Sequence, residues 1–113
     1  MKLEELAKHQ PTINWTDRMN EGDDIFTDEN IKETANVLNH YVRDLQNVGE
    51  QPAEQEIMKC VENVVVALNE LNEKYDYFIE TLEREELYEF ITEAAAIAGL
   101  EVDEDITEEW REW

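Results

Sequence analysis

The stretch AEQEIMKCVENVVVALNELNEKY (53–75) decides the fold class, because it can be read in two ways. VENVVVAL on its own is a short β-branched run that would suit a strand. Over the whole stretch, however, apolar residues return at helical spacing and fall on one face, where the side chains concerned are Ile57, Val61, Val64, Val65, Leu68 and Leu71. Sustained periodicity favours a helix over 53–75, and Met58, Val66 and Ala67 widen its apolar face. We therefore predict that this helix is the central, most buried element.

A second helix is predicted over FTDENIKETANVLNHYVRDLQ (26–46). Thr27 is the expected N-cap, and Phe26 and Ile31 stand where a hydrophobic staple places them. The predicted buried stripe consists of Ile31, Ala35, Leu38, Val42 and Leu45. Gly49 and Pro52 then interrupt the chain before the next helix.

A third helix is predicted over TLEREELYEFITEAAAIAGL (81–100), with Thr81 as its cap. Its expected apolar stripe consists of Leu82, Leu87, Phe90, Ile91, Ala94 and Ala98. Gly99 followed by the apolar Leu100 is typical of a Schellman ending. The preceding residues KYDYFIET (74–81) are compatible with an extended connector or with one short strand.

The two ends of the chain carry weaker signals. LEELAKHQ (3–10) is compatible with a helix, whereas 11–24 contains Pro11 and Gly22 and is expected to wrap irregularly over the core, with Ile13 and Trp15 tucked inside. Asp105 and Glu108 resemble a capping box, which predicts a short helix over 106–113. In that helix Ile106, Trp110 and Trp113 would share one face.

Taken together, these segments predict a single all-α domain over 1–113. The expected architecture is a compact bundle of about five helices with an irregular N-terminal segment, in which 31–45 and 82–98 lie on either side of 57–71. A length of 113 residues and a hydrophobic fraction of 42% are sufficient for a folded core.

Charge narrows the choice of partner. The chain has 30 Asp and Glu against 9 Lys and Arg, for a formal net charge of −21. Such a field repels the phosphates of nucleic acids and anionic membranes, so neither is an expected partner. A basic protein is the natural complement, while the oligomeric state stays open. The lone Cys60, the lack of a membrane-length apolar run and an N-terminus without a secretory pattern indicate the cytoplasm.

Motifs of catalysis and cofactor binding are missing from the sequence. No glycine-rich phosphate loop is present, and His9 and His40 lie on separate segments without zinc-site or di-iron spacing. Cys60 could form a nucleophile with a histidine, or it could be an inert residue within an apolar helix. We favour the inert cysteine. The oxygen-rich run 20–29 lacks the ligand spacing of a calcium loop. We expect no enzyme activity, no cofactor and no metal site.

Acidic residues concentrate in the C-terminal half of the chain. From Asp76 onward the chain contains fourteen acidic residues, and the only lysines or arginines there are Arg84 and Arg111. We predict that the last segment forms the partner-binding surface, with Ile106 and Trp110 docked on the body and Trp113 as a partly exposed anchor. The predicted binding residues are Asp103, Asp105, Glu108, Glu109, Glu112 and Trp113. The acids of 76–93 are the alternative location.

One stretch also carries a resemblance. LNELNEKYDYFIETLEREELYEFI (68–91) resembles segments of small acidic, all-helical bacterial immunity proteins, the antidotes of polymorphic and contact-dependent toxins. The resemblance implies a non-enzymatic, cytoplasmic protein that neutralises a cognate toxin, which could be a nuclease, by covering its positively charged active surface. The rival interpretation is a DNA mimic of the anti-restriction or anti-CRISPR type, whose carboxylates would imitate phosphates in a DNA-binding cleft.

Overall fold

The computed structural model describes residues 3–49, 53–100 and 106–113. These residues form five helices and no strand, which confirms the all-α prediction. In chain order the helices are α1 (Leu3–Ala7), α2 (Pro11–Asn20), α3 (Asp28–Asn47), α4 (Glu54–Lys74) and α5 (Thr81–Ala98). All five contribute buried apolar side chains to one common core.

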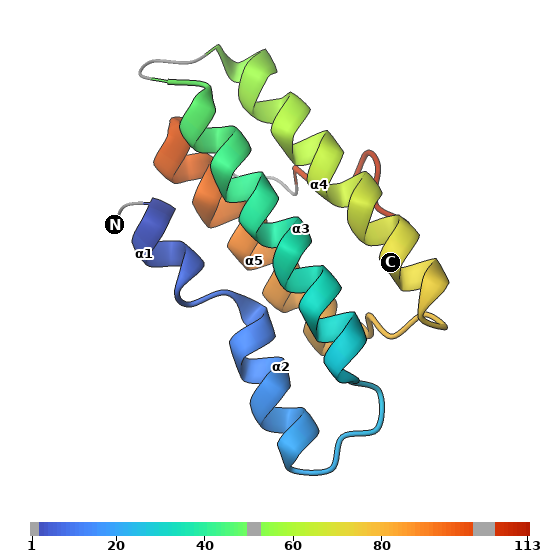
Figure 1. Ribbon diagram of the computed structural model, residues 1–113. Helices are drawn as coiled ribbons and strands as arrows, with labels where there is room; N and C mark the ends of the chain where they lie inside the picture. Colours follow the sequence, from blue (N-terminus) through green and yellow to red (C-terminus); the bar gives the residue numbers. More distant parts are fainter. Residues whose placement is uncertain (1–2, 50–52, 101–105) are drawn as a thin grey trace.

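Helix α3 is the central element of this bundle. It contacts each of the other four helices, whereas α4 contacts only α3 and α5 among the described helices. Figure 1 shows α3 between α4 on one side and the α1–α2 pair on the other, with α5 behind it. The prediction that 53–75 is central was therefore wrong. The widened apolar face of α4 is not fully buried, since Val66 is 40% exposed. Helix α3 buries its predicted stripe except for the half-buried Ala35, and it buries Thr34 and Tyr41 as well.

The start of α3 follows the prediction closely. The Thr27 hydroxyl accepts a hydrogen bond from the Asn30 N–H at 3.1 Å, and the Asn30 side chain accepts one from the Thr27 N–H at 2.9 Å. This reciprocal pair satisfies two N–H groups that have no partner within the helix. Phe26 and Ile31 are both buried, as expected for a staple.

The connection between α4 and α5 is a turn rather than a strand. Asp76 and Tyr77 have φ angles of 59° and 60°, in the left-handed region. Asn72 holds this turn from inside, because its carbonyl accepts the Tyr77 N–H and its side-chain oxygen accepts the Ile79 N–H at 2.9 Å. Of the two alternatives for 74–81, the structure shows the connector.

Helix α5 starts at Thr81, but its cap is Glu80 and not Thr81 as predicted. Glu80 and Glu83 form the capping box at this end. In this register Leu82 lies in the first turn and is 51% exposed, contrary to its predicted burial. The rest of the stripe is buried at Leu87, Phe90, Ile91 and Ala94, and Ala98 is half-buried.

The C-terminal end of α5 is the predicted Schellman motif. Gly99 has a φ of 124°, its N–H donates to the Ala96 carbonyl at 3.0 Å, and the Leu100 N–H donates to the Ala95 carbonyl at 2.9 Å. Leu100 itself is buried against the core.

Residues 11–20 are helical, where an irregular course was expected. Pro11 stands at the start of α2, where its missing N–H costs nothing and its fixed φ suits the helix. Trp15 is fully buried as predicted, whereas Ile13 is 47% exposed. Two residues apart on a helix, these side chains point in nearly opposite directions, so both cannot face the core.

The predicted helix over 106–113 does not form. Residues 106–110 are a turn, in which the Thr107 carbonyl accepts the Trp110 and Arg111 N–H groups, and 111–113 have no regular structure. Eight residues are too few for a stable isolated helix, and Glu108 and Glu112 would repel one another on it.

Candidate partner-binding surfaces

The C-terminal segment, residues 106–113, is fastened to α4 by Asn69. The Asn69 side-chain amide donates to the Trp110 carbonyl at 2.8 Å and to the Glu112 carboxylate at 3.3 Å, and its oxygen accepts the Glu112 N–H at 3.0 Å. Ile106 and Thr107, the first two residues of the segment, are buried. One asparagine thus fixes the course of the chain in the absence of a helix.

The C-terminal segment separates apolar from charged side chains. Ile106 is buried and Trp110 is half-buried, while Glu108, Glu109 and Glu112 are exposed. Trp113 is half-buried as well, with the Arg111 guanidinium 5.6 Å from the centre of its ring. The Trp113 indole N–H is buried and has no hydrogen-bond partner among the described residues.

Three of the six predicted binding residues, Glu108, Glu109 and Glu112, are exposed in the structure. Trp113 lies beside them, more inward than a free anchor would be. Asp103 and Asp105 lie outside the described residues, as does the first half of the predicted Asp105–Glu108 capping box.

The acids of α5 divide into an outer and an inner group. Glu85, Glu89 and Glu93 are exposed and follow one another at i,i+4 spacing, so they form one row of like charges along the helix. Glu83 and Glu86 turn toward α2, where both meet the Arg18 guanidinium. The row is the alternative surface that the sequence indicated within 76–93.

The inner group is a partly buried clamp that ties α2 to α5. Two Arg18 nitrogens bind the two Glu86 oxygens at 2.8 Å each, and Arg18 reaches Glu83 at 3.2 Å. The Trp15 indole N–H also donates to Glu86 at 3.2 Å. Sequence inspection missed this clamp, because a single arginine among so many acids gives no sign of which ones it binds.

The environment raises the pKa of both Arg18 and Glu83, which favours the charged form of the arginine and the neutral form of the glutamate. The hydrogen bonds that Arg18 donates to Glu86 raise the pKa of Arg18, which is thereby held in its charged form. Burial raises the pKa of Glu83 even though the backbone and Arg18 favour its charged form. Arg18 thus stays charged beside Glu86, whereas burial favours the neutral form of Glu83.

Few of the outward acids are neutralised by neighbours. Within the described residues, ion pairs involve Glu33, Asp44, Glu62, Glu83 and Glu86. Neither the α5 row nor the exposed glutamates of the C-terminal segment take part in them. Both surfaces therefore carry uncompensated negative charge, as do exposed acids elsewhere on the described chain such as Asp17 and Glu21.

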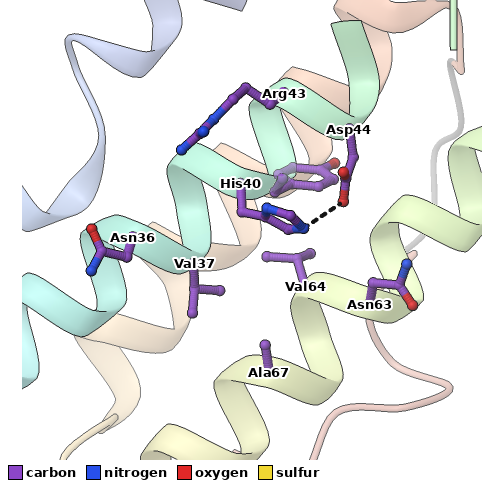
Figure 2. Close-up of a pocket in the computed structure, with 9 residues that line it drawn as sticks. Asn36, Val37, His40, Arg43, Asp44, Asn63, Val64 and Ala67 are labelled. Carbon is purple, nitrogen blue, oxygen red and sulfur yellow. Dashed lines mark ion pairs between the residues drawn. The ribbon is translucent and has the colours of Figure 1, made fainter. Parts of the chain in front are cut away.

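A groove between α3 and α4 has a different character. Its cavity of about 400 Å³ has an apolar floor that includes Val37, Val64 and Ala67, and Figure 2 shows these side chains pointing into the space between the helices. His40, Arg43 and Asp44 stand along the α3 side, with the His40 imidazole 3.6 Å from the Asp44 carboxylate. Both signs of charge are present, so this groove is not part of the acidic surface.

The surroundings of Cys60 do not suit a nucleophilic cysteine. A hollow of about 680 Å³ adjoins the first cavity and is lined by both His40 and Cys60. Burial raises the pKa of the Cys60 thiol, and the Asp44 carboxylate raises it further. A reactive cysteine needs the opposite shift, so Cys60 stays a protonated core residue at neutral pH.

The described residues lack the features of a metal site and of a membrane-spanning helix. They contain no group of three or more His, Cys, Asp or Glu side chains placed to hold a metal ion. None of their helices combines the length and apolar character required to cross a membrane.

Comparison with known proteins leaves the chain without an assigned family. No family model, curated protein or solved structure matches it.

Proposed function

We propose that this protein is a non-enzymatic inhibitor that binds a basic protein and covers its positively charged active surface. The observation that carries the proposal is the docked C-terminal segment, in which Glu108, Glu109 and Glu112 are exposed and take no part in the ion pairs of the described chain. Isolated acids on a mobile tail would lose entropy on binding, whereas acids already fixed on α4 lose less.

The chemistry of the segment suits a protein partner. Complementary charge accelerates encounter and rejects wrong partners, and aromatic side chains supply buried contact area. The segment offers both, since the half-buried Trp110 and Trp113 lie beside the glutamates. The resemblance of 68–91 to bacterial immunity proteins supports a cognate toxin as the partner and the cytoplasm as the place of action.

The test begins with affinity capture of the partner from the source cells, followed by measurement of its binding kinetics and toxicity. We expect a basic protein whose toxicity is suppressed when this chain is co-expressed. Replacing Glu108, Glu109 and Glu112 together by lysine should slow association about tenfold or more, because steering by charge is lost.

The matched control replaces Asp17, Glu21 and Asp24 by lysine. These acids are also exposed, give the same change in net charge, and lie on or beside α2, which does not contact α4. If both triple variants slow association equally, the net charge acts without a defined surface. If neither does, the C-terminal segment is not the interface.

The α5 row favours a second function, that of a DNA mimic. Glu85, Glu89 and Glu93 repeat at a regular interval on one exposed line, as phosphates do along a strand. A mimic should compete with duplex DNA for several unrelated DNA-binding proteins, whereas a toxin inhibitor should bind a single one. Competition assays with a panel of such proteins separate the two functions.

A further inference from the structure

A small cavity lies between α5 and the two N-terminal helices. Its volume is about 260 Å³, and its floor is formed by Leu6, Pro11 and Phe90, which are all buried. This is below the roughly 300–1,000 Å³ typical of sites for drug-sized ligands, so the cavity suits a single side chain better than a cofactor.

The rim of the cavity is strongly acidic. Glu86, Glu89 and Glu93 line it, at positions three and four residues apart that share one face of α5, and His9 and Asn14 complete the polar lining. Arg18 binds Glu86 on the α2 side, but Glu89 and Glu93 are exposed and belong to no ion pair of the described chain. An apolar floor with unpaired carboxylates above it is complementary to a side chain with an aliphatic stem and a cationic head.

The clamp provides an internal precedent for the head group. Arg18 already presents a guanidinium to this helix and is held by two parallel contacts of 2.8 Å from Glu86. Glu89 and Glu93 present further carboxylates on the next turns of α5, beside the cavity. The planar, two-pronged guanidinium matches carboxylates better than the single ammonium of lysine.

We propose that this cavity receives an arginine side chain from the basic partner. The stem would lie on Leu6, Pro11 and Phe90, and the guanidinium would bind Glu89 and Glu93. The proposal rests on the proposed function for the source of the arginine, and it adds a second contact point on a face built by α1, α2 and α5. The C-terminal segment would steer the partner, and the cavity would retain it.

The cavity is tested without the partner by using butylguanidinium as the probe. The isotope-labelled protein is titrated at constant ionic strength, and amide chemical shifts are followed by NMR. We expect saturable shifts that centre on Leu6, Asn14 and Phe90. Butylurea, a neutral molecule of similar shape, should produce none, because the apolar floor alone gives too little contact area.

Two double variants locate the binding. Glu89→Gln with Glu93→Gln should weaken butylguanidinium binding at least about tenfold, since charge-assisted hydrogen bonds are lost. Glu73→Gln with Glu85→Gln changes the net charge equally at exposed positions outside the cavity and should bind the probe as wild type does. All four positions are exposed, and unchanged melting temperatures confirm that both variants are folded.

Other outcomes overturn the proposal. Shifts that spread evenly over Glu85, Glu108 and Glu112, or that grow without saturation, show a diffuse cation atmosphere and no arginine site. Equal binding by the two double variants leads to the same conclusion. Neither result bears on capture of a basic toxin by wild-type protein, so the proposed function and the cavity fail separately.

Discussion

At the scale of single residues, Leu68 is the most informative position. It is fully buried on α4, so Leu68→Ala removes packed methyl groups and leaves a void. We expect the free energy of unfolding to fall by about 2–5 kcal/mol in urea titrations. Leu82→Ala is the matched control, because Leu82 is 51% exposed and its loss should change stability by about 0.5 kcal/mol or less. A Leu68→Ala variant with the wild-type midpoint would contradict the packing of α4.

Periodicity predicted the burial of most large apolar residues, including Leu38, Leu68 and Leu87, because a helix has one inward face. It failed for Val66 and Leu82, and the burial of Ile13 that was expected from an irregular N-terminal segment was also wrong. The exposure of Ile13 and Leu82 depends on where a helix begins and how it is rotated, which short segments leave undetermined. Buried polar residues such as Thr34 and Asn72 were not predicted. Thr34 donates to the Asn30 carbonyl one turn back in α3, and Asn72 accepts the Ile79 N–H across the turn after α4, so backbone groups of the formed helix and turn satisfy both.

At the scale of elements, the clamp between α2 and α5 should respond to pH through Glu83. Because burial raises the folded-state pKa of Glu83, the native protein keeps this proton at pH values where the unfolded chain has released it. Its contribution to stability is complete below the ordinary glutamate pKa of about 4.3 and is lost as pH rises through the folded-state pKa. Protonation of Glu83 leaves the paired contacts between Arg18 and Glu86 in place.

Glu83→Gln should therefore flatten the fall in stability that this group causes as the pH rises above the ordinary glutamate pKa of about 4.3. The measurement is the free energy of unfolding at several pH values, with Glu85→Gln as the exposed control on the same helix. The control should retain the wild-type slope on this account. Identical profiles for wild type and Glu83→Gln would show that Glu83 titrates alike in the folded and unfolded chains.

The elements themselves were predictable in proportion to their length. The helices α3, α4 and α5 each repeat their apolar pattern over several turns, and all three were found. Helix α2 was missed because Pro11 was interpreted as a break, although a proline at the first position of a helix starts it. For residues 106–113 the opposite error occurred, because a helix was predicted and none forms. The capping residues suggested a helix, but Asn69 hydrogen-bonds the backbone of this segment instead.

At the scale of the whole molecule, a net charge of −21 should limit stability through self-repulsion. Added sodium chloride shortens the Debye length from about 30 Å at 0.01 M to about 3 Å at 1 M, so the melting temperature should rise with salt. Each kcal/mol of relieved repulsion corresponds to about 4 °C or more for a domain of this size. A melting temperature that does not change over this range would mean that the acids are already compensated.

The arrangement of the bundle was less predictable than its parts. Apolar content pointed to α4 as the centre, but the centre is the helix that the others surround, and α3 owes this place to contacts with α1 and α2. The candidate surface was predicted only as a cluster of acids near the C-terminus. Its attachment through Asn69, the clamp at Arg18 and the cavity at Glu89 and Glu93 all depend on residues distant in sequence.

The different burial of the three tryptophans gives the protein two built-in optical reporters. Trp15 is fully buried and stacked on Phe26 with ring centres 5.3 Å apart, while Trp110 and Trp113 are half-buried beside exposed glutamates. A cationic quencher such as caesium should concentrate at this acidic surface and quench the fluorescence of Trp110 and Trp113, whereas iodide should be repelled. Emission from Trp15 changes only when the core opens. Unlabelled protein can thus report the arrival of a partner and the melting of its interior as separate fluorescence signals.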